Sequence, residues 1–222
     1  SAGQQSELIL VEGDSALRAV ARVRDERFQA VLPMQGKPMN AAKAGKKSIR
    51  RNKWFAALVD ALGVGWNPVS AGTMRYDRVA FLFDPDADGI HCGALMLMFF
   101  DRYLRLLLDE KRVSLIKPPM FEIRAVGFHD RLQAYRLQAY SEDHLQRIRT
   151  ALESQRIEHR QVRYRGLASL DAVTLRHHCV APETRTAYLL QHQDAQAAEA
   201  IFGGSHRATG GRSLAARRTG ET

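Results

Sequence analysis

The sequence contains few cysteines and no long apolar run. Its two cysteines, Cys92 and Cys179, cannot build the disulfide framework of a small secreted protein, so we expect a reducing compartment, the cytoplasm. The longest apolar stretch, Ala94 to Phe100, is far too short to span a membrane, and the polar start SAGQQSE does not resemble a secretory signal. We therefore expect no membrane partner. With 222 residues, 45% of them hydrophobic, the chain can form one large domain, alone or with an appendage.

Acidic residues are missing from one part of the chain. The whole sequence carries 33 Lys and Arg against 24 Asp and Glu, a net charge of +9. Between Met34 and Val59 there is no acidic residue, whereas seven basic residues occur there: Lys37, Lys43, Lys46, Lys47, Arg50, Arg51 and Lys53. A merely solvated surface usually mixes both signs. Although many basic proteins bind no nucleic acid, this distribution favours a polyanionic partner, nucleic acid before a membrane.

Strands and helices alternate in the first half of the chain. We expect strands at Leu8–Val11, Ala30–Leu32, Arg78–Phe83 and Val113–Ile116. We expect a helix after the turn Glu12-Gly13-Asp14-Ser15, with Asp14 or Ser15 as its cap, and a second helix through WFAALVDALG that ends at Gly63 or Gly65. Two further helices are expected from Gly89 to Leu108 and from Ser141-Glu142-Asp143 through Leu152. The segment between Met34 and Lys53 is typical of a basic loop. This order predicts an α/β fold, a mainly parallel sheet flanked by helices, with a smaller C-terminal appendage.

Three carboxylates, Asp84, Asp86 and Asp88, follow the apolar run RVAFLF at a spacing of two residues. Side chains at this spacing in an extended segment point to the same side, so they can converge if the turn stays open. Crowded carboxylates raise one another's pKa unless a cation lies among them, and oxygen ligands favour Mg²⁺ or Ca²⁺. Glu12 ends another expected strand and can supply a proton donor or acceptor beside such a metal. The carboxyl ends of the strands, where both turns lie, are the usual ligand edge of a parallel sheet.

Other functions compete for this acidic stretch. An EF-hand loop needs a bidentate Glu at its twelfth position, where this chain has Leu95, and is rejected. A phosphoaspartyl enzyme carries a threonine where this chain has Asp88. An acidic, solvated turn without a ligand is the remaining alternative. Three aspartates in register after a buried strand favour the metal site.

Several stretches together resemble a known family. In chain order, SELILVEGDSA, FQAVLPMQGKPMNAAKA, DPDADGIH and VSLIKPPMFEI resemble the Toprim region of type IIA DNA topoisomerases, in particular the bacterial B-type subunits of gyrase and topoisomerase IV. VRYRGLASLD and APETRTAYLLQHQDAQAAEAIF resemble the C-terminal stretches of the same subunits. The resemblance implies a Rossmann-like Toprim domain at 1–125, a hairpin and helix insertion at 126–160, and a B-subunit-like tail at 161–203. Residues 204–222, rich in Gly, Ser, Thr and Arg, are expected to be disordered.

The resemblance also implies roles for single residues. Glu12 would be the general acid–base that protonates the departing 3′-oxygen of DNA, and Asp84 and Asp86 would hold Mg²⁺, with Asp88 as a further ligand or support. Glu12 is counted with these three as a metal residue. The residues expected to bind DNA are Lys37, Asn40, Lys43, Lys46, Lys47, Arg50, Arg51 and His91. On spacing alone, His91 can equally be a packed helix residue.

Partners follow from the same resemblance. In this family the nucleophilic tyrosine lies on an A-type subunit, so we expect DNA and that subunit as partners, in a bacterial cytoplasm close to the nucleoid. ATP would act only through a nucleotide-binding domain that this chain lacks, and the chain alone is not expected to be active. The family pattern is changed at Leu17, Arg18, Gln35, Cys92 and Gly93. These changes leave an alternative open: a diverged, stand-alone Toprim module that binds DNA or the partner subunit without cleavage. An independent nuclease or primase-like protein is disfavoured by the C-terminal stretches.

Overall fold

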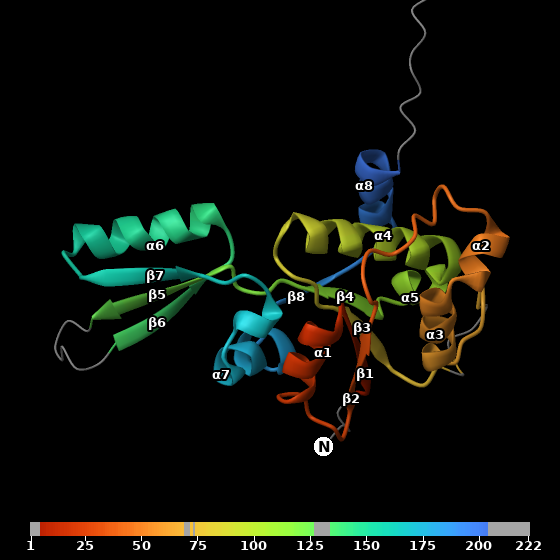
Figure 1. The fold of residues 1–222 in the computed structure, drawn as a ribbon, viewed down its shortest axis with the longest axis horizontal. Coiled ribbons are helices and arrows are strands. Elements are labelled where there is room, and N and C mark those ends of the chain that lie inside the picture. Colours follow the sequence, from red (N-terminus) through yellow and green to blue (C-terminus); the bar gives the residue numbers. More distant parts are fainter. Residues whose placement is uncertain (1–4, 69–71, 73, 127–133, 204–222) are drawn as a thin grey trace, which may run out of the picture.

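A computed structural model describes residues 5–68, 72, 74–126 and 134–203 of the chain (Figure 1). Its main sheet has five strands in the order β2-β1-β3-β4-β8. The strands are β1 (Glu7–Val11), β2 (Gln29–Pro33), β3 (Arg78–Phe81), β4 (Val113–Ile116) and β8 (Ala187–Leu189). The first four run parallel, and β8 is antiparallel to β4. The expected α/β fold with a mainly parallel sheet is therefore confirmed, and the C-terminal tail adds an edge strand that the sequence did not predict.

Helices cover both faces of this sheet because its strands are apolar on both sides. All five residues of β1 are buried, as in a central parallel strand. Leu8 and Leu10 pack into one core cluster, and Ile9 and Val11 pack into the cluster on the opposite face. This alternation along one strand divides the domain into two cores.

The larger core lies under five helices. They are α2 (Lys46–Arg51), α3 (Lys53–Leu62), α4 (Ala87–Tyr103), α5 (Arg105–Asp109) and α8 (His192–Phe202). Phe55 of α3 stacks on Phe99 of α4 with ring centroids 4.0 Å apart. Figure 1 shows α8 packed on the outer side of α4, so the tail returns to the helix that follows the acidic turn.

The smaller core is closed by α1 (Asp14–Ala21) and by the tail. The tail contributes a 3₁₀ turn, η1 (Leu167–Ser169), the short helix α7 (Ala172–Leu175) and a π-helical turn, η2 (Arg176–Val180). A buried ion pair joins the tail to the sheet, since Arg185 binds the carboxylate of Glu7 at the start of β1. The tail is thus part of the packing of the Toprim-like sheet.

A second, three-stranded antiparallel sheet lies beside the first (Figure 1). It consists of β5 (Phe121–Val126), β6 (Ala134–Ala139) and β7 (His159–Arg163) in the order β6-β5-β7, with α6 (Glu142–Ser154) packed on one side. Ser141 caps α6 by accepting a hydrogen bond from the His144 N–H, so this helix starts where the sequence predicted. This sheet begins at Phe121, within the residues expected to form the first domain, and the boundaries at 125 and 160 stay a prediction. The expected disorder at 204–222 lies outside the described residues.

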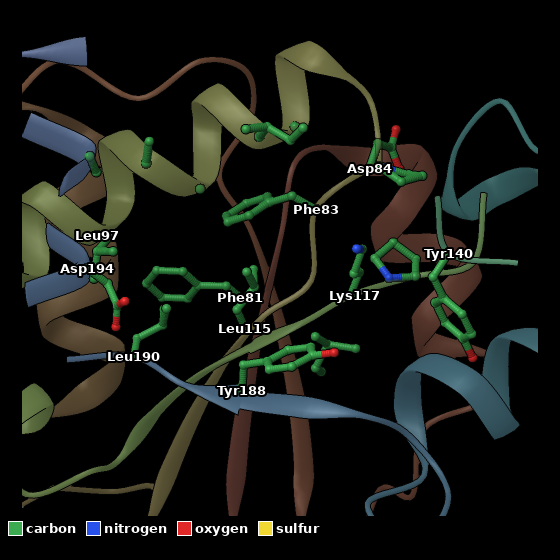
Figure 2. Close-up of a pocket in the computed structure, with 18 of the residues that line it drawn as sticks. Phe81, Phe83, Asp84, Leu97, Leu115, Lys117, Tyr140, Tyr188, Leu190 and Asp194 are labelled. Carbon is green, nitrogen blue, oxygen red and sulfur yellow. The ribbon is translucent and has the colours of Figure 1, made fainter. Parts of the chain in front are cut away.

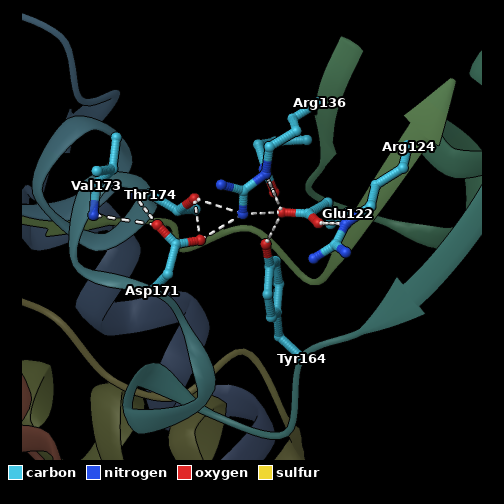
Figure 3. Close-up of polar contacts among 8 residues, drawn as sticks. Glu122, Arg124, Arg136, Tyr164, Asp171, Val173 and Thr174 are labelled. Carbon is cyan, nitrogen blue, oxygen red and sulfur yellow. Dashed lines mark hydrogen bonds and ion pairs between the residues drawn. The ribbon is translucent and has the colours of Figure 1, made fainter. Parts of the chain in front are cut away.

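A buried carboxylate connects this small sheet to the tail (Figure 3). Glu122 of β5 is 1% exposed and accepts hydrogen bonds from Arg124, Arg136 and the Tyr164 hydroxyl. Arg136 also binds Asp171, the residue that caps α7. These bonds hold the small sheet against the tail.

Several local expectations were wrong. The long helix expected over 89–108 starts at Ala87 and breaks at Leu104, because the Asn67 N–H takes the Tyr103 carbonyl that a continuous helix would need. The basic segment expected to be a loop contains α2. Neither Asp14 nor Ser15 caps α1, since the helix begins at Asp14 itself and Gly13 occupies the cap position. The end of α3 at Gly63, which has φ 73°, is confirmed.

Candidate metal centre

The acidic residues meet at one edge of the main sheet. Glu12 directly follows β1 and Asp84 follows β3, and these strands are parallel neighbours. Their carboxyl ends therefore lie at the same edge, as the sequence argument required. Burial raises the pKa of Glu12, and the negative charges of Asp84, Asp86 and Asp88 raise it further. The four carboxylates are thus close enough to influence one another.

Asp84 is the most enclosed of the three aspartates. Its side chain is half-buried, and its Oδ1 accepts a hydrogen bond of 2.8 Å from the Leu167 backbone N–H in the tail. Burial raises the pKa of Asp84, the Leu167 hydrogen bond opposes this rise, and the charge of Asp86 adds to it. A carboxylate held in this way carries its charge at a cost in free energy, which a nearby cation would offset.

Asp86 and Asp88 belong to the beginning of α4. Asp86 caps the helix, its Oδ1 accepting a 2.8 Å hydrogen bond from the Gly89 N–H, and Asp88 lies in the first turn. The extended path expected through all three aspartates is therefore wrong, because capping by Asp86 starts the helix at Ala87. Gly89 makes this tight start possible, since a Cβ there would lie 2.0 Å from the Asp84 carbonyl oxygen.

The donor set fits a divalent cation in its chemistry. All four groups are carboxylates, which hard cations such as Mg²⁺ prefer. Among the described residues no hydrogen bond engages Oδ2 of Asp84, Asp86 or Asp88, so each keeps an oxygen for a ligand. Within the same described ranges, no three His, Cys, Asp or Glu side chains stand in an arrangement that could already hold a metal ion. Side-chain rotations would have to complete the ligand set.

Three residues expected to contact DNA surround the first turns of α4. The Lys37 Nζ lies 3.2 Å from Asp88 Oδ1 in an exposed ion pair. The Asn40 side-chain amide donates to the Phe202 carbonyl at the end of α8, and the His91 ring stacks on the Phe202 ring with centroids 4.9 Å apart. The structure therefore brings Lys37 to the acidic cluster, and places Asn40 and His91 in contact with the last turn of α8.

The remaining basic residues extend away from the acids along α4. The segment that leads from Lys37 to α2 contacts Arg102 near the far end of α4. The Arg102 guanidinium donates hydrogen bonds to the Ala41 and Ala42 carbonyls of this segment. Asp88 and Arg102 are separated by 14 residues of helix, or about 20 Å. Beyond this point α2 exposes four basic side chains: Lys46, Lys47, Arg50 and Arg51. With Lys43, also exposed, they form a positively charged track that leads away from the carboxylates.

Two contacts at the site were not anticipated from the sequence. Cys92, a residue of the larger core, places its Sγ 3.9 Å from Glu12 Oε1. Gly166 and Leu167 of the tail approach Asp84 directly. In the sequence, Gly166 and Leu167 stood out only as part of a stretch similar to the family, and Cys92 only as a departure from it. No local pattern links residues about 80 positions apart, so neither contact could be predicted.

An apolar pocket of about 790 Å³ opens beside Asp84 (Figure 2). It lies between α4, the ends of β3 and β4, and the edge strand β8, with Asp84 at one end and Asp194 at the other. Aromatic and aliphatic side chains such as Phe81, Leu115 and Tyr188 form most of its wall. This lining does not suit phosphate, so the pocket is distinct from the chemistry of the acidic cluster.

No helix in the described ranges of the chain has the length and apolar character needed to cross a membrane.

The fold and the acidic edge agree with a family match. The Toprim domain model matches residues 7–118, which is half of the chain, and this protein belongs to the Toprim domain family. The matched range includes β1 to β4 and all four carboxylates.

Individual relatives narrow the resemblance. The chain is 34% identical over 200 residues to the B subunit of DNA gyrase from Thermotoga maritima, covering 90% of this chain and 30% of that one. It is 33% identical to the B subunit of DNA gyrase from Thermus thermophilus, with 90% and 31% covered, and 32% identical to the B subunit of DNA topoisomerase 4 from Enterococcus faecalis, with 88% and 28% covered. The similarity thus continues past residue 118 into the tail. The chain spans about 30% of the length of these curated relatives.

Proposed function

We propose that this chain is the magnesium-binding Toprim part of the B-type polypeptide of a type IIA DNA topoisomerase. It supports double-strand cleavage and religation by the tyrosine of an A-type partner. The observation that carries the proposal is the meeting of Glu12 and Asp84 at the ends of adjacent parallel strands, in a chain similar to gyrase B subunits along 90% of its length. The isomerase activity, its ATP dependence through a nucleotide-binding domain outside this chain, and its place beside DNA in a bacterial cytoplasm belong to the same proposal.

Glu12 is the proton carrier of the proposed site. Its pKa is raised by burial and by the three aspartates, so its carboxyl group keeps its proton to a higher pH than an exposed glutamate and can deliver it to a leaving oxygen. It protonates the 3′-oxygen as the strand is cut and takes the proton back on religation. Asp84 and Asp86 hold Mg²⁺, with Asp88 in support, and the chemistry that a bound Mg²⁺ supplies there is electrostatic stabilisation of charge on the leaving oxygen.

DNA follows the positively charged track. Lys37 links the track to the acids, and exchange of its ion pair with Asp88 for a DNA phosphate costs little because both side chains are exposed. The basic face of α2 then contacts phosphates about 20 Å further along α4, with Lys43 between them. The contacts are electrostatic, so they position the duplex without reading its sequence.

Reconstitution tests this function. The protein is mixed with an A-type subunit encoded in the same genome, and Mg²⁺-dependent double-strand breaks in plasmid DNA are counted. Glu12→Gln and Asp86→Asn should each abolish the breaks. The second substitution keeps the side-chain oxygen that caps α4, so it removes charge with little effect on the helix. Breaks of undiminished frequency in both variants would refute the proposed roles.

Two observations favour a second function, a diverged module that binds DNA or the partner subunit without cleavage. Asn40 and His91 are engaged by Phe202, and Cys92 lies against the proposed proton carrier. In that case, DNA binding would be independent of Mg²⁺ and no breaks would form with any A-type subunit. The reconstitution separates the two functions directly.

A further inference from the structure

The tail passes directly over one of the proposed metal ligands. We propose that Gly166 and Leu167 are positioning residues that clamp the Asp84 carboxylate in the orientation needed to bind a divalent cation. This inference rests on the function proposed above and deepens it. It makes metal affinity a property of the tail as well as of the Toprim sheet.

Both oxygens of Asp84 meet the tail. The Leu167 N–H donates a 2.8 Å hydrogen bond to Oδ1. A Cβ added to Gly166 would lie 2.6 Å from Oδ2, 3.0 Å from Cγ and 3.1 Å from Oδ1, and Gly166 has φ +157°. The backbone thus approaches the carboxylate so closely that only glycine fits. Any side chain at position 166 would push the end of Asp84 aside.

The turn that makes these contacts is fixed independently of Asp84. The side chain of Leu167 is fully buried in the smaller core, which Ile9 and Val11 of β1 also form. The Ser169 hydroxyl donates a 2.6 Å hydrogen bond to the Gly166 carbonyl, and its oxygen accepts one of 3.0 Å from the Arg165 N–H. The clamp is therefore anchored to β1, the strand that Glu12 directly follows, and it holds two proposed site residues in a constant relation.

A carboxylate fixed before binding loses less conformational freedom when the metal arrives. Groups that orient a ligand from behind it are commonly worth about 10- to 100-fold in metal affinity. Asp84 is half-buried and follows a strand that ends at Phe81, so its side chain depends on such contacts for its direction. Loss of the clamp should weaken metal binding while most of the fold, which Asp84 does not support, stays intact.

The test measures Mn²⁺ binding by the 222-residue chain, with free Mn²⁺ counted by electron paramagnetic resonance. Gly166→Ala should weaken binding by about tenfold or more. The matched control is Gly45→Ala, because Gly45 has φ −67° and nothing lies within 4 Å of a Cβ there. The Mn²⁺ affinity of this control variant should equal that of the wild type. A second variant, Ser169→Ala, loosens the turn without adding bulk and should weaken binding by a smaller factor. It keeps the test decisive if Gly166→Ala fails to fold.

A spectroscopic readout separates positioning from a general structural role. The Leu167 amide resonance of the wild-type chain should shift on titration with Mg²⁺, because its acceptor becomes a metal ligand, and this shift should be lost in Gly166→Ala. Equal Mn²⁺ affinities for the wild type and both tail variants would overturn the positioning role and leave the proposed function standing. A wild-type chain that binds no Mn²⁺ would overturn the proposed metal site and the positioning role together.

Discussion

Replacement of Arg185 by alanine should remove much of the free energy by which this chain is stable. Arg185 lies in the tail, 178 residues after Glu7, and its guanidinium binds both oxygens of that carboxylate. The side chains of Arg185 and Glu7 are only 5% and 3% exposed. Gln29 completes the arrangement by donating to Glu7 and to the Val180 carbonyl, which Arg185 also contacts. Arg185→Ala leaves the Glu7 charge buried without its cation.

The magnitude follows from that burial. Removal of one partner from a buried ion pair typically costs about 3–5 kcal/mol, a large part of the roughly 5–15 kcal/mol by which domains are stable. With a urea slope of about 2.5 kcal/mol per molar, the unfolding midpoint should fall by about 1–2 M. Urea denaturation of the 222-residue chain, followed by far-UV circular dichroism, measures this shift.

Two further variants make the measurement specific. Arg27→Ala removes the arginine of the ion pair with Asp25, in which the Arg27 side chain is 82% exposed, and should leave the midpoint close to that of the wild type. Replacement of both partners, Glu7→Leu with Arg185→Met, should recover most of the loss because no charge remains buried. A fall of less than about 0.4 M for Arg185→Ala, equivalent to about 1 kcal/mol, would refute the reasoning.

Three other perturbations have definite expected results. Burial alone would raise the pKa of Glu122, but hydrogen bonds from Arg136, Arg124 and Tyr164 lower it from 4.5 to about 2. The contribution of Glu122 to stability is therefore complete above pH 4.5 and is lost as the pH falls toward 2. Urea midpoints at about pH 2–6 should therefore depend less on pH in Glu122→Gln than in the wild type, and parallel curves would contradict this. Burial raises the pKa of Cys92 to about 11 and that of Cys179 to about 12, so neither thiol should react with a disulfide reagent near pH 8 until the chain is denatured; rapid reaction of the native protein would refute this. Charge should also be reversed at the four basic side chains of α2: Lys46, Lys47, Arg50 and Arg51. This change should flatten the salt dependence of DNA affinity, measured by fluorescence anisotropy, and an unchanged slope would show that α2 does not contact DNA.

Much of the main sheet could be predicted from the sequence. The runs at β1, β2, β3 and β4 are apolar on both faces and alternate with helical segments, and this pattern has few solutions other than a parallel sheet. The same reasoning placed Glu12 and Asp84 at one edge, because strand ends in such a sheet share a side. What it missed was local geometry. Asp86 caps α4, so Asp86 and Asp88 lie at a helix start in place of an extended turn.

Contacts between distant segments could not be predicted. The edge strand β8 is only three residues long, and its pairing with β4 depends on the path of the tail. The break at Leu104 depends on an amide of Asn67, and the environment of Asn40 and His91 depends on Phe202. In each case the deciding group comes from another part of the chain.

The sequence by itself determined the alternation of strands and helices and the basic segment, because these depend on residues that are neighbours in the chain. It also determined the acidic edge, because the strands of a parallel sheet end on the same side. Only the tertiary structure decided that the tail closes the smaller core, binds Glu7 and donates a hydrogen bond to Asp84. Those contacts join residues 83 to 178 positions apart, and their partners are selected by packing, burial and hydrogen bonding that exist only once the chain has folded.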